Sequence, residues 1–431
     1  MSTAFTHADF AQPQPTSRTV STRAIRNAAV WLLFFSGFMV FIEPAPFEIA
    51  FGLVAAIFIF TGLKISLLFL PLITLLVMYN VGGGLSLMGV AEETRAIWFI
   101  TISAYMAVMA IVIAAIFSED TQRRLELMKS GYALAAVIAS VCGIIGYFNV
   151  AGTSEIFTRY GRAMGTFKDP NVFSTFIVLP VVYLIQGFFL GTHKRPVLAG
   201  ATLMVIVAGL FLSFSRGAWG VAVAAILLSI LLSFLTAQSG KTRVRIIIIA
   251  MIGVALFIML LAIALQFEAI RSTFEVRASL NQDYDHGETG RFGNQKRAIP
   301  LLLDLPNGFG PTIFRDIFPE DPHNTFLNAF ASYGWIGGIS YMTLIFTTMI
   351  VGWTMVFKKT PWQRDAIAVW SSFFFLMLQG MQIDTDHWRH FYVQLGLTWG
   401  LMLASLRYEA WRRAYPEQTA EWPTLTAQTE R

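Results

Sequence analysis

Residues 246–265 read IIIIAMIGVALFIMLLAIAL, a run without a single charged side chain. A straight α-helix of about 20 residues is long enough to cross the hydrocarbon core of a bilayer. Lys241, Arg243 and Arg245 precede the run, and basic residues are enriched on the cytoplasmic side of membrane spans. The stretch therefore predicts a transmembrane helix that enters the membrane from the cytoplasm.

The composition of the whole chain leads to the same class of protein. Of its 431 residues, 55% are hydrophobic and 13% are charged, and the mean hydropathy is +0.61. A soluble domain carries roughly 25% charged residues, so lipid must cover much of this apolar surface. We expect an all-α polytopic membrane protein with about a dozen transmembrane helices. The alternative for the second and third runs is one re-entrant hairpin. The expected spans are 27–43, 47–63, 65–81, 95–117, 131–149, 171–190, 197–215, 217–236, 246–265, 324–357, 366–383 and 391–406.

The positions of the basic residues predict the orientation. With both termini in the cytoplasm, every expected inner loop carries at least one of the 31 Lys and Arg residues, as the positive-inside rule requires. The predicted organisation is a disordered cytoplasmic tail (1–26), a single transmembrane domain (27–406) and a cytoplasmic tail (407–431). A long outer loop with short helices (266–323) lies within that domain. The outer basic residues gather in 150–170, 266–323 and 384–390, which makes the outer face the candidate functional face. The net charge of +5 reflects membrane orientation and is no argument for nucleic-acid binding.

Arg216 stands in the sequence LSFSRGAW (212–219), between two apolar runs that leave almost no loop. A guanidinium at this depth needs a cavity, a partner or an anionic ligand. It is either an anion-binding residue or an interfacial arginine whose side chain reaches the lipid headgroups.

The segment RYGRAMGTFKDPN (159–171) leads into a helix through Pro170. Asp169 is placed to cap that helix, and proline suits its first turn. Arg162 and Lys168 lie just before the helix N-terminus, where the helix dipole and the cations would together favour an anion. The alternative is an outer loop that merely carries positive charge.

His323 opens the long tenth run, and an imidazole there can accept a proton from a hydroxyl. The loop DTDHWRH (384–390) is the most polar short turn in the chain, and Arg389 within it is a further candidate anion ligand. Its Asp-x-Asp pair is a weak signal for a divalent ion, and its histidines with His323 form only an unconstrained zinc set. A plain loop histidine remains the alternative for His323.

The expected spans contain no Asp, Glu or Lys deep inside their apolar runs. Proton-coupled transporters usually need acidic groups at membrane depth. This disfavours a secondary transporter, although a transporter of lipid-linked glycan stays open as another class.

Several short motifs together resemble the bacterial O-antigen ligase and O-antigen polymerase superfamily, whose members are membrane glycosyltransferases. In chain order they are RAMGTFKDPN (162–171), SFSRG (213–217), GRF (290–292), NGFG (307–310) and PHN (322–324). The motifs span about residues 160–345, and the expected topology extends the resemblance to nearly the whole chain.

The resemblance implies a metal-independent, cofactor-free glycosyltransferase of the bacterial inner membrane with its active site facing the periplasm. The donor would be a glycan on undecaprenyl diphosphate. The acceptor would be lipid A–core in a ligase, which we favour, or a second lipid-linked saccharide in an O-antigen or exopolysaccharide polymerase. By motif, Arg216 and His323 correspond to the residues essential in the family, while Arg162, Lys168 and Arg291 are weaker correspondences.

The chemistry of these residue types fits that activity. Arginines stabilise the negative charge that develops on a departing diphosphate, and a histidine can take the proton of the attacking hydroxyl. Direct displacement would invert the anomeric carbon, and it needs no pair of carboxylates of the kind that glycoside hydrolases use.

Overall fold

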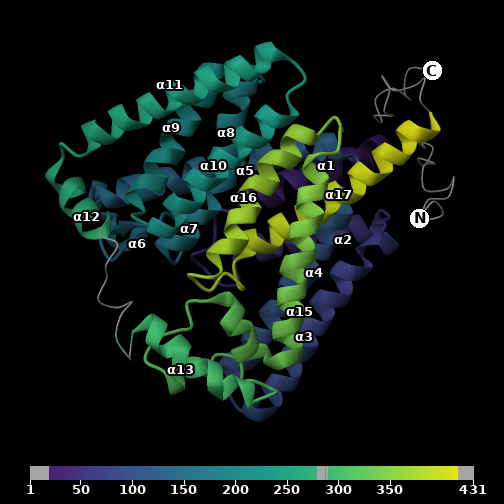
Figure 1. Ribbon diagram of the computed structural model, residues 1–431, viewed down its shortest axis with the longest axis vertical. Helices are drawn as coiled ribbons and strands as arrows, with labels where there is room; N and C mark the ends of the chain where they lie inside the picture. Colours follow the sequence, from purple (N-terminus) through teal and green to yellow (C-terminus); the bar gives the residue numbers. More distant parts are fainter. Residues whose placement is uncertain (1–18, 279–286, 288–289, 416–431) are drawn as a thin grey trace.

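The computed structural model describes residues 19–278, 287 and 290–415, and these are almost entirely helical (Figure 1). The longer helices before the middle of the chain are α1 (Thr19–Ser36), α2 (Pro46–Phe60), α3 (Leu70–Leu87), α4 (Thr94–Phe117), α5 (Thr121–Tyr147), α8 (Val178–Leu190) and α9 (Pro196–Leu212). Those after it are α10 (Arg216–Thr236), α11 (Gly240–Ala264), α12 (Glu268–Ala278), α13 (Arg291–Leu303), α15 (Thr325–Val356), α16 (Gln363–Gln379) and α17 (Arg389–Ala414). The short elements are η2 (Leu67–Phe69), η3 (Met88–Val90), η4 (Val150–Gly152), α6 (Ser154–Phe157), α7 (Pro170–Phe176), α14 (Phe314–Ile317) and the paired strands β1 (Thr158–Arg159) and β2 (Arg162–Ala163).

Seven helices in the described ranges are long and apolar enough to cross a membrane. They are Leu67–Val90, Thr94–Phe117, Thr121–Tyr147, Pro170–Leu190, Arg216–Thr236, Gly240–Ala264 and Thr325–Val356. In α11 only 6% of the most apolar window is buried inside the protein, so lipid must cover the rest. The chain is therefore a multi-pass membrane protein.

The helices at the two ends of the described chain extend into the segments predicted as tails. Helix α1 already begins at Thr19, inside the expected tail 1–26, and α17 continues to Ala414, beyond the expected boundary at 406. Residues 1–18 and 416–431, and the part of the outer loop at 279–286 and 288–289, lie outside the described residues.

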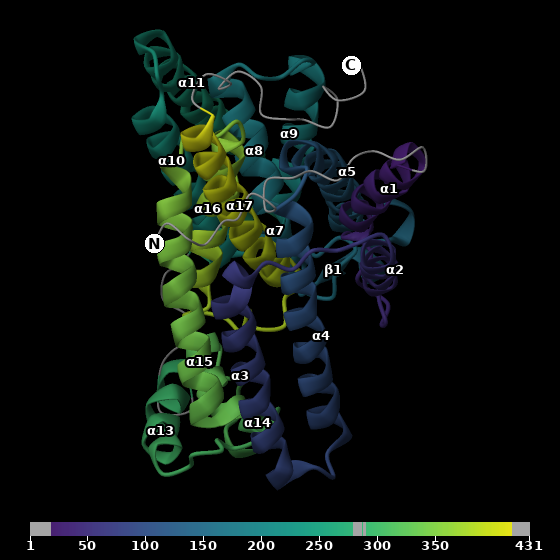
Figure 2. The same cartoon turned by 90° about the vertical axis from the view of Figure 1, so that its right-hand side faces the viewer.

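Small residues bring the main helices into close contact. Gly82 on α3 faces the backbone of Gly337 on α15, and Gly396 and Gly400 on α17 face Ala110 and Ala114 on α4. Small residues at such crossings allow membrane helices to approach closely. In both views α3 lies along α15, and α15 also packs against α13 (Figures 1 and 2).

Helix α15 is a hairpin rather than the single long span that the run 324–357 predicted. Gly334 interrupts it with φ 64° and ψ −168°, and the ring centroids of Phe326 and Tyr341 lie only 5.7 Å apart. Fifteen residues of straight helix would separate them by about 22 Å. A short arm (325–333) therefore runs from His323 to Gly334, and a long arm (335–356) returns beside it with enough residues to span a membrane.

The NGFG motif (307–310) holds the turn of this hairpin. The backbone N–H groups of Phe309 and Gly310 both donate to the carbonyl of Ala331, at 2.8 and 3.2 Å, and Trp335 N–H donates to the carbonyl of Pro306 at 2.8 Å. Gly308 has φ 71°, and a Cβ there would lie 2.4 Å from the carbonyl of Phe330. The motif is thus a structural clamp on the reversal at Gly334.

We expect Gly334→Ala to destabilise the protein by about 1–3 kcal/mol, because its backbone conformation is one that only glycine adopts at low cost. An added Cβ would also lie 2.5 Å from the carbonyl of Pro306. Thermal unfolding in detergent measures the change. Gly84→Ala is the matched control, since nothing lies within 4 Å of a Cβ at Gly84; equal melting temperatures for the two variants would contradict the hairpin.

Candidate functional site

Arg216 is the first residue of α10, and the turn before it is tightly held. Ser215 caps the helix by accepting from Ala218 N–H at 3.4 Å, and Phe214 has a left-handed φ of 46°. The half-buried Arg216 therefore lies at the N-terminus of a long helix, where backbone N–H groups and the dipole favour an anion.

Asn171 connects this turn to the RAMGTFKDPN motif. Its side-chain oxygen accepts from Ser215 Oγ and from Arg162 Nη2, each at 2.8 Å. Arg162 also donates from Nε to the Ser213 carbonyl at 2.8 Å and is only 8% exposed. Asp169 caps α7 through Asn171 N–H at 2.7 Å, which confirms the predicted cap. These contacts make Arg162 a residue that positions the turn before Arg216.

The segment from Gln379 to Asp384, which begins at the last residue of α16, lies against the start of α10 and against α13. A Cβ on Gly217 would lie 3.1 Å from Gln379 Nε2 and 4.0 Å from Gln382 Oε1. Arg291, the first residue of α13, donates from Nη1 to the Gln382 carbonyl at 3.1 Å. This segment, called the 379–384 segment below, thus brings the neighbourhoods of Arg216 and Arg291 together.

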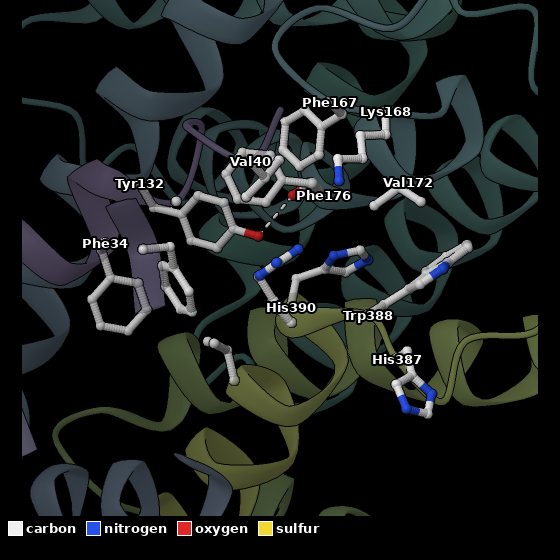
Figure 3. Close-up of a pocket in the computed structure, with 14 residues that line it drawn as sticks. Phe34, Val40, Tyr132, Phe167, Lys168, Val172, Phe176, His387, Trp388 and His390 are labelled. Carbon is white, nitrogen blue, oxygen red and sulfur yellow. Dashed lines mark hydrogen bonds between the residues drawn. The ribbon is translucent and has the colours of Figure 1, made fainter. Parts of the chain in front are cut away.

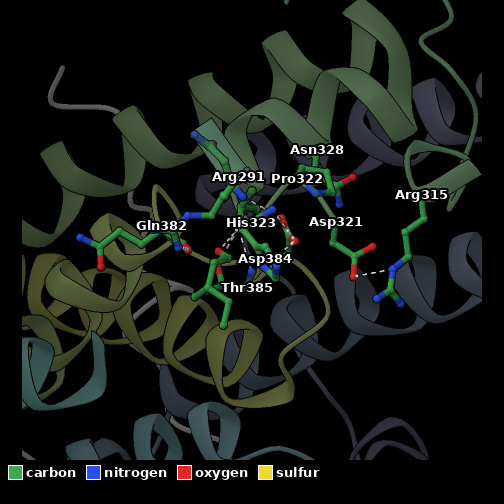
Figure 4. A network of polar contacts seen from close by, with 12 residues as sticks. Arg291, Arg315, Asp321, Pro322, His323, Asn328, Gln382, Asp384 and Thr385 are labelled. Carbon is green, nitrogen blue, oxygen red and sulfur yellow. Dashed lines mark hydrogen bonds and ion pairs between the residues drawn. The ribbon is translucent and has the colours of Figure 1, made fainter. Parts of the chain in front are cut away.

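His323 is attached to the end of the same segment (Figure 4). The Asp384 carboxylate accepts from the backbone N–H groups of His323 and Asn324, both at 3.0 Å, and lies 4.0 Å from His323 Nδ1. Gln295 on α13 supports the preceding turn by donating to the Pro322 carbonyl at 2.8 Å. His323 therefore joins Arg291 and the 379–384 segment on one side of the molecule.

The two titratable groups of this pair are shifted in opposite directions. Burial lowers the pKa of His323, with Asp321 and Glu320 partly opposing it, and this favours the neutral imidazole. Burial and the nearby Asp386 and Asp321 raise the pKa of Asp384 to about 8, while the two backbone N–H groups lower it. Such opposed shifts are common at functional sites.

Lys168 and Arg389 lie elsewhere, on a cavity lined also by residues of α1, α5 and α7 (Figure 3). Lys168 Nζ is 2.7 Å from Glu43 Oε1, and the Arg389 guanidinium pairs with Glu48. Both cations are thus neutralised by residues of the α1–α2 connection and of α2. The structure does not bring them together with Arg216, Arg291 and His323.

The Asp-x-Asp pair of the last outer loop is used for internal hydrogen bonds. Asp384 holds the His323 turn, and Asp386 accepts from Asn328 Nδ2 at 2.9 Å. Within the described ranges, no group of three or more His, Cys, Asp or Glu side chains is arranged to hold a metal ion.

Sequence reasoning missed the central role of the 379–384 segment. Gln379 also accepts from Thr175 Oγ1 at 3.3 Å, and Thr325 donates to the Ile383 carbonyl at 3.0 Å. The one signal in the sequence was the polarity of 384–390. It directed attention to Arg389 and to metal binding rather than to Asp384 as the partner of His323.

A comparison with known protein families gives a match in the part of the chain that contains Arg216, Arg291 and His323. Residues 201–342 match the family described as O-Antigen ligase. The match includes Arg216, Arg291 and His323, and it confirms the resemblance to the O-antigen ligase and polymerase superfamily. No match was found among curated proteins.

Fold and site together define a polytopic α-helical membrane protein with an arginine- and histidine-containing centre. The similarity of residues 201–342 to the O-Antigen ligase family supports a place in the O-antigen ligase and polymerase superfamily. Proteins of this superfamily are membrane glycosyltransferase-like enzymes that act on lipid-linked saccharides.

The raised pKa of Asp384 predicts a measurable pH dependence of stability. A carboxyl whose pKa rises from 3.8 to about 8 on folding stabilises the protein at low pH, and this contribution is lost as pH rises from about 4 to 8. We therefore expect the melting temperature of wild type to fall more steeply over this range than that of Asp384→Asn. Asp304→Asn, at an exposed position, is the control; equal slopes for wild type and Asp384→Asn would contradict the assignment.

Proposed function

We propose that the protein is an O-antigen ligase-like glycosyltransferase that moves a glycan from undecaprenyl diphosphate to lipid A–core at the periplasmic face of the inner membrane. The observation that carries this proposal is that Gly217 next to Arg216, Arg291 and His323 all lie against the 379–384 segment, with His323 held by Asp384. A cationic group and a neutral base on one segment suit a reaction that expels a diphosphate and deprotonates a hydroxyl.

In the proposed reaction the acceptor hydroxyl oxygen attacks the anomeric carbon, and the bond from that carbon to the diphosphate oxygen breaks. His323 takes the hydroxyl proton. The diphosphate leaves with the bonding electron pair, and its charge is stabilised by Arg216, Arg291 and the N-terminus of α10. Displacement from the opposite side inverts the anomeric carbon, and these residues perform their steps without a metal ion.

The proposed topology places both termini in the cytoplasm, about a dozen spans in the membrane, and α12, α13 and α14 in a periplasmic loop. The 379–384 segment and His323 lie on the same side of the chain as that loop. The positions of Lys241, Arg243 and Arg245 at the other end of α11 support this orientation.

We expect His323→Ala to lower glycan transfer by a factor of about 10²–10⁴, because it removes the proton acceptor. Arg216→Ala should lower it about 10²–10³-fold through lost charge stabilisation, and Arg216→Lys should restore part of the activity. Purified protein in liposomes, supplied with lipid-linked glycan and lipid A–core, measures the product.

The matched control is Arg123→Ala, an exposed arginine paired with Glu126 at 3.5 Å on α5, which should keep wild-type activity. Undiminished transfer by His323→Ala would exclude it as the base. Longer lipid-linked chains in place of glycosylated lipid A–core would identify the polymerase alternative. Movement of lipid-linked glycan across the liposome without any product would identify a transporter.

The lowered pKa of His323 predicts where activity is lost in acid. A base works only while it is unprotonated, and lowering its pKa keeps it unprotonated to a lower pH. The acidic limb of kcat/KM should therefore lie below pH 6.5, the ordinary value for histidine. Transfer rates between pH 5 and 8 measure this limb, and a limb above pH 6.5 would contradict the burial of the imidazole.

A further inference from the structure

The cavity beside Lys168 and Arg389 lies on the other side of α7 from the Arg216 turn. On one face of α7, Asn171 and Thr175 form hydrogen bonds with Ser215 and Gln379. On the other face, Val172 and Phe176 line the cavity. The cavity has a volume of about 190 Å³. It lies between α7, the α1–α2 connection, α5 and the start of α17 (Figure 3).

The walls of this cavity are mainly aromatic. The rings are those of Phe34, Phe47, Tyr132, Phe167, Phe176 and Trp388. Its volume is smaller than the roughly 300–1,000 Å³ of pockets for drug-sized ligands. An occupant of the size of one ring therefore suits it better than an extended chain.

The charges around the cavity balance. Lys168 pairs with Glu43 at 2.7 Å, and Arg389 pairs with Glu48. A phosphate at this place would bind two cations but would also meet two carboxylates at short range, and that repulsion offsets its attraction. The geometry thus disfavours the role of diphosphate ligand that the sequence suggested for Lys168 and Arg389.

His390 is a buried polar group on the wall of the cavity. Its side chain is buried, with 4% of the residue exposed, and its Nε2 atom has no hydrogen-bond partner in the part of the chain that the structure describes. The ring lies 5.3 Å from that of Trp388 and 6.2 Å from that of Phe176. Buried polar atoms are normally paired, so this nitrogen points to a ligand that supplies a hydroxyl.

We propose that this cavity binds one uncharged sugar ring of the glycan, away from the bond that is transferred. The aromatic rings would pack against the C–H face of the sugar. His390 Nε2 would exchange a hydrogen bond with a hydroxyl, and the Arg389–Glu48 pair would offer both donors and acceptors to neighbouring hydroxyls. A hydrocarbon chain would leave His390 unpaired. The inference rests on the proposed glycan transfer.

The test compares His390→Phe, which keeps an aromatic ring but removes the polar nitrogen, with wild type in liposomes. Loss of one hydrogen bond to a sugar should raise KM for the lipid-linked glycan about tenfold. The value of kcat should stay within about twofold, because His390 takes no part in the proposed chemistry. Competition by bare undecaprenyl diphosphate, which has no sugar, should be unchanged. Trp388→Leu should weaken the glycan in the same selective way by removing a wall ring.

The control variant is His193→Phe, whose histidine lies at the end of α8, where Nε2 is 2.8 Å from the Leu184 carbonyl. An unchanged KM for the glycan in both cavity variants would overturn the proposal. So would a parallel loss of affinity for bare undecaprenyl diphosphate, since it would assign the cavity to the lipid or the phosphates. Direct binding of lipid-linked glycan to purified protein is measured alongside. It separates a failed sugar site from a failed transferase, because binding is measurable without turnover.

Discussion

One carboxylate fixes the relation between the catalytic candidate and the rest of the site. Asp384 accepts hydrogen bonds from the backbone N–H groups of His323 and Asn324, both at 3.0 Å. His323 has a φ of 45°, a region that residues with a Cβ occupy only when their surroundings hold them there. The same segment carries the Gln382 carbonyl that Arg291 binds, so this contact connects the histidine with the cationic part of the site.

The membrane helices make that contact possible. The short arm of α15 begins beside Asp384, ends at Gly334 and packs against the long arm. Tyr333 at the end of the short arm stacks on Tyr79 of α3, with ring centroids 3.9 Å apart. The ring centroid of Tyr341 on the long arm lies 5.6 Å from that of Tyr79. A turn buried between packed helices has few alternative arrangements. The position of His323 is therefore set by a rigid hairpin instead of by a long loop.

The sequence predicted the elements well but not their meeting points. Hydropathy identified the apolar helices because lipid demands a continuous run of apolar residues, and local chemistry identified the Asp169 cap. It could not predict that 324–357 folds back at Gly334, since a hairpin and a straight span have the same composition. Nor could it find the bond from Asp384 to His323, because 61 residues separate these partners. Contacts over such distances depend on the packing of the intervening helices, and short motifs carry no record of it.

The distribution of charge separates the two sides of α7. Around Arg216, the N-terminus of α10 contributes the positive potential of its backbone N–H groups, and the amide side chains of Gln379 and Gln382 lie close to the neighbouring Gly217. Around Lys168 and Arg389, Glu43 and Glu48 cancel the positive charge. An anionic leaving group is stabilised by positive potential from cationic side chains and a helix N-terminus, whereas sugar hydroxyls need donors and acceptors without net charge. On the proposed function, α7 thus separates the place where charge develops from the place where the glycan is recognised, and the two requirements need not compete for the same residues.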